Sequence, residues 1–175
     1  MTEIIETERL ILRKIEESDC EFVYSLLNSP GWLKYIGDRG INNLEDAKTY
    51  IREKVVSLYD QHGYGPYGVR TKLNNSLIGF CGLFKRESLE DADVGFAFLP
   101  EHSGKGYAIE SAVSVLDNAR DVIGLKRVSA ITLEGNDRSI NVLKKLGMSF
   151  KEKIIYPGSG EELLLYSIEL TKYDS

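Results

Sequence analysis

Three short segments rich in β-branched and aromatic residues follow one another in the middle of the chain, and they constrain its fold most. They are "YGVRT" (67–71), "LIGFCGLFK" (77–85) and "DVGFAFL" (93–99). The turn-forming "KLNNS" joins the first two, and β-strands with such short connections pair antiparallel. The sequence therefore predicts an antiparallel meander at the centre of the fold.

Strand and helix patterns precede this meander. The stretch "TERLILR" (7–13) alternates apolar and polar residues and predicts a first strand. Apolar residues at helical spacing predict one helix over residues 19–28, ended by "NSPG", and a second over residues 44–61 that Asn43 caps. A loop is predicted over residues 32–42, between these helices.

After the meander the chain alternates helices and strands. The patterns predict a helix over residues 108–123, a strand over 127–133, a helix between a capping Asn136 and a terminating Gly147, and a closing hairpin of "SFKEKIIY" and "ELLLYSIEL". No repeat or linker interrupts residues 1–175, so we expect a single α+β domain. Its mixed sheet of about seven strands would carry helices on both faces.

Composition narrows the class of protein. The 175 residues are 42% hydrophobic and 28% charged, and no apolar run approaches the roughly 20 residues of a membrane span. The acidic "MTEIIETERL" lacks the features of a signal peptide, so we expect a cytoplasmic protein. The net charge of −5 argues against a nucleic-acid partner. Cys20, Cys81 and the two histidines show no metal-ligand spacing, so no metal site is expected.

A glycine-rich loop, "PEHSGKG" (100–106), separates the meander from the next helix. Gly104 and Gly106 leave room for successive backbone N–H groups to point at an anion, and the start of the helix reinforces that attraction. Ile109 stands where the dinucleotide fingerprint needs a glycine, and the Walker spacing is absent. We therefore predict a site for some other phosphate compound, with a tight strand-to-helix connection as the alternative.

The segments "DVGFAFLPEHSGKGYAIESA", "NDRS" and "VLKKLGM" together resemble the GNAT superfamily of N-acetyltransferases, in its ribosomal-protein acetyltransferase-like branch. The resemblance extends from "TERLILR" through the closing hairpin, with two departures, Glu101 and Ser103, beside the loop. It implies the acyl-CoA N-acyltransferase fold, whose mostly antiparallel sheet splays apart in the middle. It also implies an enzyme that transfers an acetyl group from acetyl-CoA directly to a primary amine in a ternary complex.

The resemblance assigns residues that bind the acetyl donor to three places. The loop and the N–H groups after it would bind the pyrophosphate, a backbone N–H at the end of "DVGFAFL" would polarise the thioester carbonyl, and the N-x-x-S motif would contact pantetheine. These residues are Gly104, Lys105, Gly106, Tyr107 and Ala108, then Phe98 or Leu99, and finally Asn136 and Ser139. Asn136 also suits the role of a helix cap.

Three side chains are candidates for proton transfer. The resemblance places the hydroxyl of Ser139 near the thioester sulfur, as a proton donor. Asp93 and Glu134 are the nearest carboxylates by position, and either would accept the proton of the amine through water. An exposed surface acid is the alternative for each, and water alone is the alternative base. The resemblance also implies a structural role for Glu110, one helical turn after the loop, in steadying the loop or nearby backbone amides.

The acceptor is the least constrained part of the prediction. Trp32 and Tyr35 lie between the first two predicted helices, which form a rim of the acceptor groove in this superfamily, with simple packing as the alternative. The amine is either a protein N-terminus or a small molecule such as a polyamine or an antibiotic, and the acidic balance favours a cation. A catalytically idle acyl-CoA-binding sensor or assembly module is the alternative function. The oligomeric state, monomer or homodimer, stays open.

Overall fold

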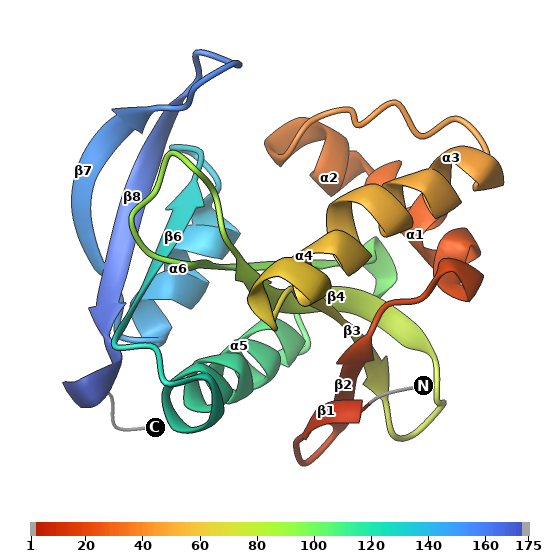
Figure 1. The fold of residues 1–175 in the computed structure, drawn as a ribbon, viewed down its shortest axis with the longest axis horizontal. Helices are drawn as coiled ribbons and strands as arrows, with labels where there is room; N and C mark the ends of the chain where they lie inside the picture. Colours follow the sequence, from red (N-terminus) through yellow and green to blue (C-terminus); the bar gives the residue numbers. More distant parts are fainter. Residues whose placement is uncertain (1–2, 173–175) are drawn as a thin grey trace.

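A single sheet of eight strands runs through residues 3–172, the part of the chain that the computed structural model describes. Its strand order is β1-β2-β3-β4-β5-β6-β8-β7 (Figure 1). The strands are β1 (Glu3–Glu6), β2 (Leu10–Lys14), β3 (Pro66–Thr71), β4 (Leu77–Phe84), β5 (Asp93–Phe98), β6 (Arg127–Thr132), β7 (Ser149–Ile155) and β8 (Glu162–Glu169). The meander of β3, β4 and β5 and the hairpin of β7 and β8 confirm the predicted pairings. The additional strand is β1, whose two adjacent isoleucines show no alternation.

Six α-helices occur within these residues. They are α1 (Cys20–Leu27), α2 (Pro30–Tyr35), α3 (Leu44–Tyr50), α4 (Ser57–His62), α5 (Tyr107–Asn118) and α6 (Asp137–Lys145). A π-helical turn, Ile51–Val56, joins α3 to α4, and another, Ala119–Ile123, extends α5. The loop predicted over residues 32–42 is wrong in its first part. Pro30 begins α2 as well as following α1, because proline is well suited to the first turn of a helix.

Two predicted helix ends are confirmed by their local geometry. The Asn43 Oδ1 accepts a hydrogen bond from the N–H of Asp46 at 2.8 Å, which caps α3. Gly124 ends the extension of α5 with a φ of +85°, in the left-handed region that favours glycine. Short polar and glycine signals therefore set these boundaries as expected.

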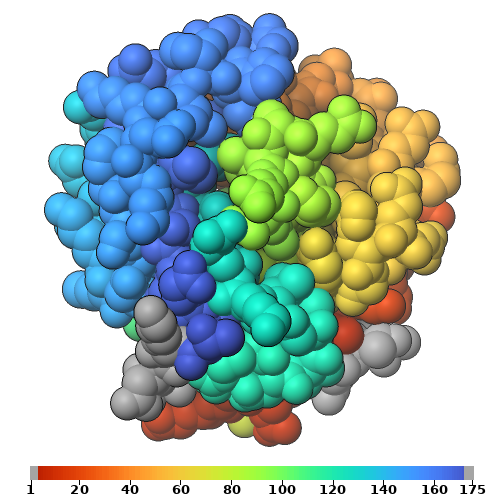
Figure 2. Space-filling model, turned by 60° about the vertical axis from the view of Figure 1, so that its left-hand side comes forward, coloured from red at the N-terminus to blue at the C-terminus, as the bar shows by residue number. Residues whose placement is uncertain are grey.

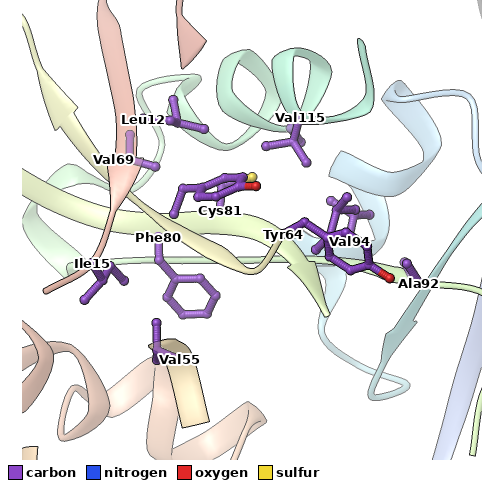
Figure 3. Close-up of a cluster of buried hydrophobic side chains, with 14 of the residues drawn as sticks. Leu12, Ile15, Val55, Tyr64, Val69, Phe80, Cys81, Ala92, Val94 and Val115 are labelled. Atoms are coloured by element: carbon purple, nitrogen blue, oxygen red, sulfur yellow. The ribbon is translucent and has the colours of Figure 1, made fainter. Parts of the chain in front are cut away.

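The sheet separates two groups of helices. Phe80 and Cys81 are neighbours on β4, so their side chains point to opposite faces. Phe80 packs edge-on against Trp32 of α2, with ring centroids 5.4 Å apart, whereas Cys81 lies against Ser111 of α5. Figure 3 shows the two sets of core side chains, with Ile15 and Val55 on the side of Phe80, and Leu12, Val69 and Val115 on the side of Cys81. Helices therefore cover both faces, as predicted.

β5 and β6 are parallel neighbours that meet at one end. Within residues 3–172 they share a single registered pair, Asp93 with Ser129, whereas each other pair of neighbouring strands shares at least three. The Ser129 N–H donates to the carbonyl of Ala92 at 2.9 Å, at this same end. The two strands then separate toward their C-terminal ends, which confirms the predicted splay.

Over the described residues, no helix combines the length and the apolar character that crossing a bilayer would require. The same residues contain no group of three or more His, Cys, Asp or Glu side chains placed to hold a metal ion. Cys20 and Cys81 are both buried and free.

Candidate active site

The glycine loop lies at the C-terminal end of β5, where the sheet is open. A short 3-10 turn, Pro100–His102, leads into it, and α5 follows. Gly104 and Gly106 have φ values of +77° and +83°, which other residues adopt only with strain. Among the described residues, no protein acceptor receives a hydrogen bond from the backbone N–H groups of residues 104–109. The loop thus presents a run of free donors at a helix N-terminus, an arrangement that suits an anion.

The side chain of Arg9 connects this loop to the start of β2. Its Nη1 donates to the carbonyl of Lys105 at 3.0 Å, and its Nε donates to the Glu110 Oε1 at 2.8 Å. The guanidinium also lies over the ring of Tyr107, 4.5 Å from its centroid. The Glu110 Oε2 in turn accepts from the hydroxyl of Thr7 at 2.8 Å and from the N–H of Arg9 at 3.2 Å. Glu110 is therefore linked to the loop through Arg9.

These contacts change the acidity of Glu110. Burial raises the pKa of this carboxyl, but the hydrogen bonds from Arg9 and Thr7 together outweigh burial, so the pKa lies below its ordinary value of 4.5. Glu110 is therefore ionised at neutral pH, where it stays paired with the Arg9 guanidinium.

The free edge of β5 faces the gap between the half-sheets. The N–H of Leu99 donates to the carbonyl of Ile78 on β4 at 2.8 Å. Because backbone groups alternate in direction along a strand, the N–H groups of Phe96 and Phe98 point the other way, toward β6. Of the two predicted positions, Phe98 therefore keeps a free N–H and Leu99 does not.

Asn136 and Ser139 lie across the gap, where α6 begins after β6. The Asn136 Oδ1 accepts a hydrogen bond from the N–H of Ser139 at 3.4 Å, so the asparagine does cap α6. The cap uses only the side-chain oxygen. No bond to another described residue involves the Asn136 side-chain NH₂ group or the Ser139 hydroxyl, and both are available to a ligand.

Asp93 begins β5 at the closed end of the gap, and its side chain is only 2% exposed. The Arg86 Nε donates to both of its carboxylate oxygens, at 3.0 and 3.2 Å, and the Arg86 Nη1 donates to the hydroxyl of Tyr156 at 3.1 Å. Figure 2 shows the β4–β5 loop, which carries Arg86, beside the β7–β8 hairpin. Burial raises the pKa of Asp93 to about 6, although Arg86 opposes the shift. The alternative of an exposed surface acid is therefore wrong for Asp93.

Glu134 has different surroundings. Its side chain is 70% exposed and lies 3.5 Å from the Nζ of Lys153 on β7. It follows Ser129, the partner of Asp93, by five positions, or about 16 Å along an extended strand. The structure therefore does not bring the two predicted carboxylates together, and Glu134 matches the surface-acid alternative.

The two residues predicted to contact the amine substrate, Trp32 and Tyr35, differ in their exposure. Trp32 is 5% exposed, packs against Phe80 on the sheet, and has a buried Nε1 without a hydrogen-bond partner among the described residues. Its side chain belongs to the core, in agreement with the packing alternative. Tyr35, at the end of α2, is half-buried, and the Nζ of Lys34 lies 5.0 Å from the centroid of its ring. Tyr35 is therefore the one of the two that remains a candidate near the surface.

Three residues of this region, Arg9, Arg86 and Tyr156, were not predicted from the sequence. Arg9 precedes Lys105 by 96 positions, and Arg86 precedes Tyr156 by 70. No local pattern connects partners at such separations. The local patterns around these residues indicate only secondary structure: Arg9 lies in the strand-forming "TERLILR", and Tyr156 directly precedes the turn "PGSG".

Comparison with known sequences agrees with this geometry. The profile of the acetyltransferase (GNAT) domain matches residues 9–149. The uncharacterised N-acetyltransferase YoaA from Bacillus subtilis is 28% identical over 156 residues, which cover 89% of this chain and 87% of the relative. Spermidine N(1)-acetyltransferase from Escherichia coli is 23% identical over 148 residues, which cover 83% of this chain and 75% of the relative.

Solved structures share the fold. An acetyltransferase (GNAT family) from Bacillus anthracis has a TM-score of 0.79 at 26% identity, covering 96% of this chain and 99% of the other. Ribosomal-protein-S5-alanine acetyltransferase from Vibrio fischeri has a TM-score of 0.79 at 19% identity, covering 100% of both chains. Spermidine N-acetyltransferase from Vibrio cholerae, in complex with CoA and spermine, has a TM-score of 0.78 at 19% identity, covering 95% and 99%. The profile match over most of its length, on a splayed sheet with a glycine loop at the opening, shows that this chain belongs to the GNAT family of acetyltransferases.

Proposed function

We propose that this acetyltransferase holds acetyl-CoA with the pyrophosphate on residues 104–108 and transfers the acetyl group directly to a primary amine in a ternary complex. The run of free backbone N–H groups at the opening of the sheet carries this proposal. Such donors at a helix N-terminus suit a phosphate group. There is room for one, since a Cβ added at Gly104 would meet no atom within 4 Å.

The gap between β5 and β6 suits the pantetheine arm. An extended amide chain would pair with the free edge of β5 as an added strand, and the side-chain NH₂ group of Asn136 would donate to it from the other side. The N–H of Phe98 is our candidate for polarising the thioester carbonyl, because it points into the gap. Leu99 is not carried forward in this role, since its N–H is already bonded.

The remaining residues are assigned to proton transfer. The amine nitrogen bonds to the acetyl carbon as the carbon–sulfur bond breaks, and the Ser139 hydroxyl donates a proton to the sulfur. Asp93 begins β5, five residues before Phe98, so it accepts the amine proton through a chain of waters, and the same chain returns a proton to Ser139. A pKa of about 6 leaves Asp93 mostly ionised at neutral pH and able to accept that proton. Glu134 is the second candidate base, and its exposure makes it the weaker one.

For the acceptor we propose a primary amine, with a protein N-terminus and a polyamine as the classes to test. Relatives named for ribosomal-protein alanine and for spermidine share this fold, and the net charge of −5 favours a cationic acceptor. Tyr35 is the proposed contact on the acceptor side. We place the enzyme in the ribosomal-protein acetyltransferase-like branch and in the cytoplasm.

Calorimetric titration of acetyl-CoA tests the donor site first. We expect micromolar-range binding to the wild type and no binding to Gly106→Trp, because a side chain there strains a backbone with a φ of +83° and begins 3.4 Å from the Arg9 Nη2, so the loop must shift. Gly124→Trp is the matched control, because Gly124 has a similar φ, +85°, with open space around it at the other end of α5. Loss of binding in both variants, or no binding to the folded wild type, would contradict the proposal.

A panel of spermidine and alanine-terminated peptides then tests turnover, with release of free CoA as the readout. Acetylation of one class identifies the acceptor. Acetyl-CoA binding without turnover of any amine would support the alternative of a catalytically idle acyl-CoA-binding module.

A further inference from the structure

We propose that Arg9 is a positioning residue that orients the donors of the glycine loop toward the pyrophosphate from behind, without touching the ligand. The inference rests on the proposed donor site. It adds to that site a residue from outside the loop, since Arg9 lies between β1 and β2. Its basis is the hydrogen bond from the Arg9 Nη1 to the carbonyl of Lys105 at 3.0 Å.

The geometry of the peptide bond links the hydrogen bond at the Lys105 carbonyl to the direction of the next N–H group. The carbonyl of Lys105 and the N–H of Gly106 belong to one planar trans peptide, so they point in opposite directions. When Arg9 holds the carbonyl on one side, the N–H of Gly106 is directed to the other. Arg9 therefore sets the direction of a donor that it does not contact.

The loop has little else to hold it. Among the described residues, the bond from Arg9 is the one hydrogen bond to residues 103–106 that comes from outside residues 99–110. Two glycines in this segment have no side chains to anchor it, and glycine allows the widest range of backbone conformations. Without Arg9, we expect the peptide between Lys105 and Gly106 to sample other orientations, at an entropic cost to binding.

The guanidinium is itself fixed in place. Its Nε donates to Glu110 at 2.8 Å, and its Cζ lies over the ring of Tyr107, 4.5 Å from the ring centroid. Glu110 also accepts from Thr7, so the carboxylate has three donors around it. Only arginine offers separate N–H groups in a rigid fork that can bind a carboxylate and a carbonyl at once. A lysine would keep the charge but lose this geometry.

The test compares two acetyl donors. Acetyl-CoA contains the pyrophosphate, whereas acetyl-pantetheine lacks it and would use only the gap between β5 and β6. In Arg9→Ala, we expect the KM for acetyl-CoA to rise about three- to tenfold, the cost of ordering one more flexible group on binding. We expect the KM for acetyl-pantetheine, and kcat with either donor, to stay within about twofold of the wild type.

Three further variants make the result specific. Arg9→Lys should behave like Arg9→Ala, because the fork is lost in both. Glu110→Gln, which leaves Arg9 in place but weakens its anchor, should raise the KM for acetyl-CoA by a smaller factor. Arg52→Ala is the control, since Arg52 is an exposed arginine that pairs with Glu17 and, among the described residues, makes no hydrogen bond or ion pair with the loop. It should change neither KM.

Several results would overturn the inference. One is an unchanged KM for acetyl-CoA in folded Arg9→Ala, with folding checked by thermal unfolding. Another is full rescue by Arg9→Lys, which would make Arg9 a direct electrostatic ligand. An equal rise of the KM for acetyl-CoA and the KM for acetyl-pantetheine in Arg9→Ala would indicate a general loss of structure. If Arg9→Ala does not fold, Glu110→Gln with an unchanged ratio of the two KM values overturns it. Absence of acetyl-CoA binding to the wild type would instead reject the proposed donor site, and this inference with it.

Discussion

Asp93 is a carboxylate whose surroundings oppose its ionisation. Its position in the acidic run "ESLEDAD" suggests a solvated group, yet its side chain is almost completely buried and paired with Arg86. Burial raises the pKa to about 6, and Arg86 keeps it from rising further. Because the folded-state pKa lies above the ordinary value of 3.8, ionisation of Asp93 lowers stability as the pH rises from about 4 to about 6.

This pair leads to a prediction about pH. If Asp93 accepts the amine proton, kcat/KM for the amine should rise with pH through an apparent pKa near 6. This rise is the acidic limb of the pH profile. Removing the positive charge in Arg86→Gln should move the limb to higher pH, because Arg86 lowers the pKa of Asp93. Rate measurements from pH 5 to 9 provide the check. Asp93→Asn should abolish the limb and Glu134→Gln should leave it in place; the reverse result would assign the base to Glu134.

At the scale of elements, local signals predicted most of the chain. Caps, terminating glycines and the change from helical to alternating periodicity identified the long helices, the meander and the closing hairpin. α2 does not follow from the sequence, because Pro30 suits a helix end as well as a helix start, and neither does β1, because four residues carry too little pattern. The glycine loop was recognisable from its own residues. The contact of Arg9 with it was not, because it depends on which sheet edge the fold places beside the loop.

A buried ion pair joins β2 to the turn before α1 and is expected to contribute to the stability of the fold. Arg13 donates from Nη1 and Nη2 to the two carboxylate oxygens of Asp19, each at 2.8 Å, and the two side chains are 6% and 10% exposed. Removing one partner leaves a buried charge unpaired, which costs about 3–5 kcal/mol. Asp19→Ala should lower the free energy of unfolding by this amount, measured in urea.

Glu17 is the matched control for Asp19. It belongs to the same short turn, Glu17–Asp19, but its side chain is 48% exposed and pairs with the exposed Arg52. Glu17→Ala should cost less than about 1 kcal/mol. Equal losses in the two variants would show that the turn, rather than the buried pair, determines the stability here.

At the scale of the whole molecule, the sheet is divided into two parts. β1 to β5 form one continuous antiparallel part and β6 to β8 the other, with Asp93 and Ser129 as the registered pair between them in the described chain. α5 follows the glycine loop and packs on β4 and β5. The proposed donor site therefore lies where the sheet is least complete.

Amide hydrogen exchange along β5 can test how the gap is filled. Without a ligand, the N–H groups of Phe96 and Phe98 should exchange fast, and those of Ala97 and Leu99, which face β4, should exchange slowly. Saturation with CoA should slow exchange at Phe96 and Phe98 and change the other two much less. Equal slowing along the whole strand would indicate general rigidification instead of pairing along this edge.

The single pair between β5 and β6 also bears on the lifetime of the protein in a cell. A ligand that binds only the folded chain stabilises it by an amount that grows with its free concentration, about 2.7 kcal/mol at roughly 100 times its Kd. If acetyl-CoA fills the opening, then transient separation of the two half-sheets, and the proteolysis that follows it, will be most frequent when acetyl-CoA is scarce. The abundance of the enzyme would then follow the supply of its own co-substrate.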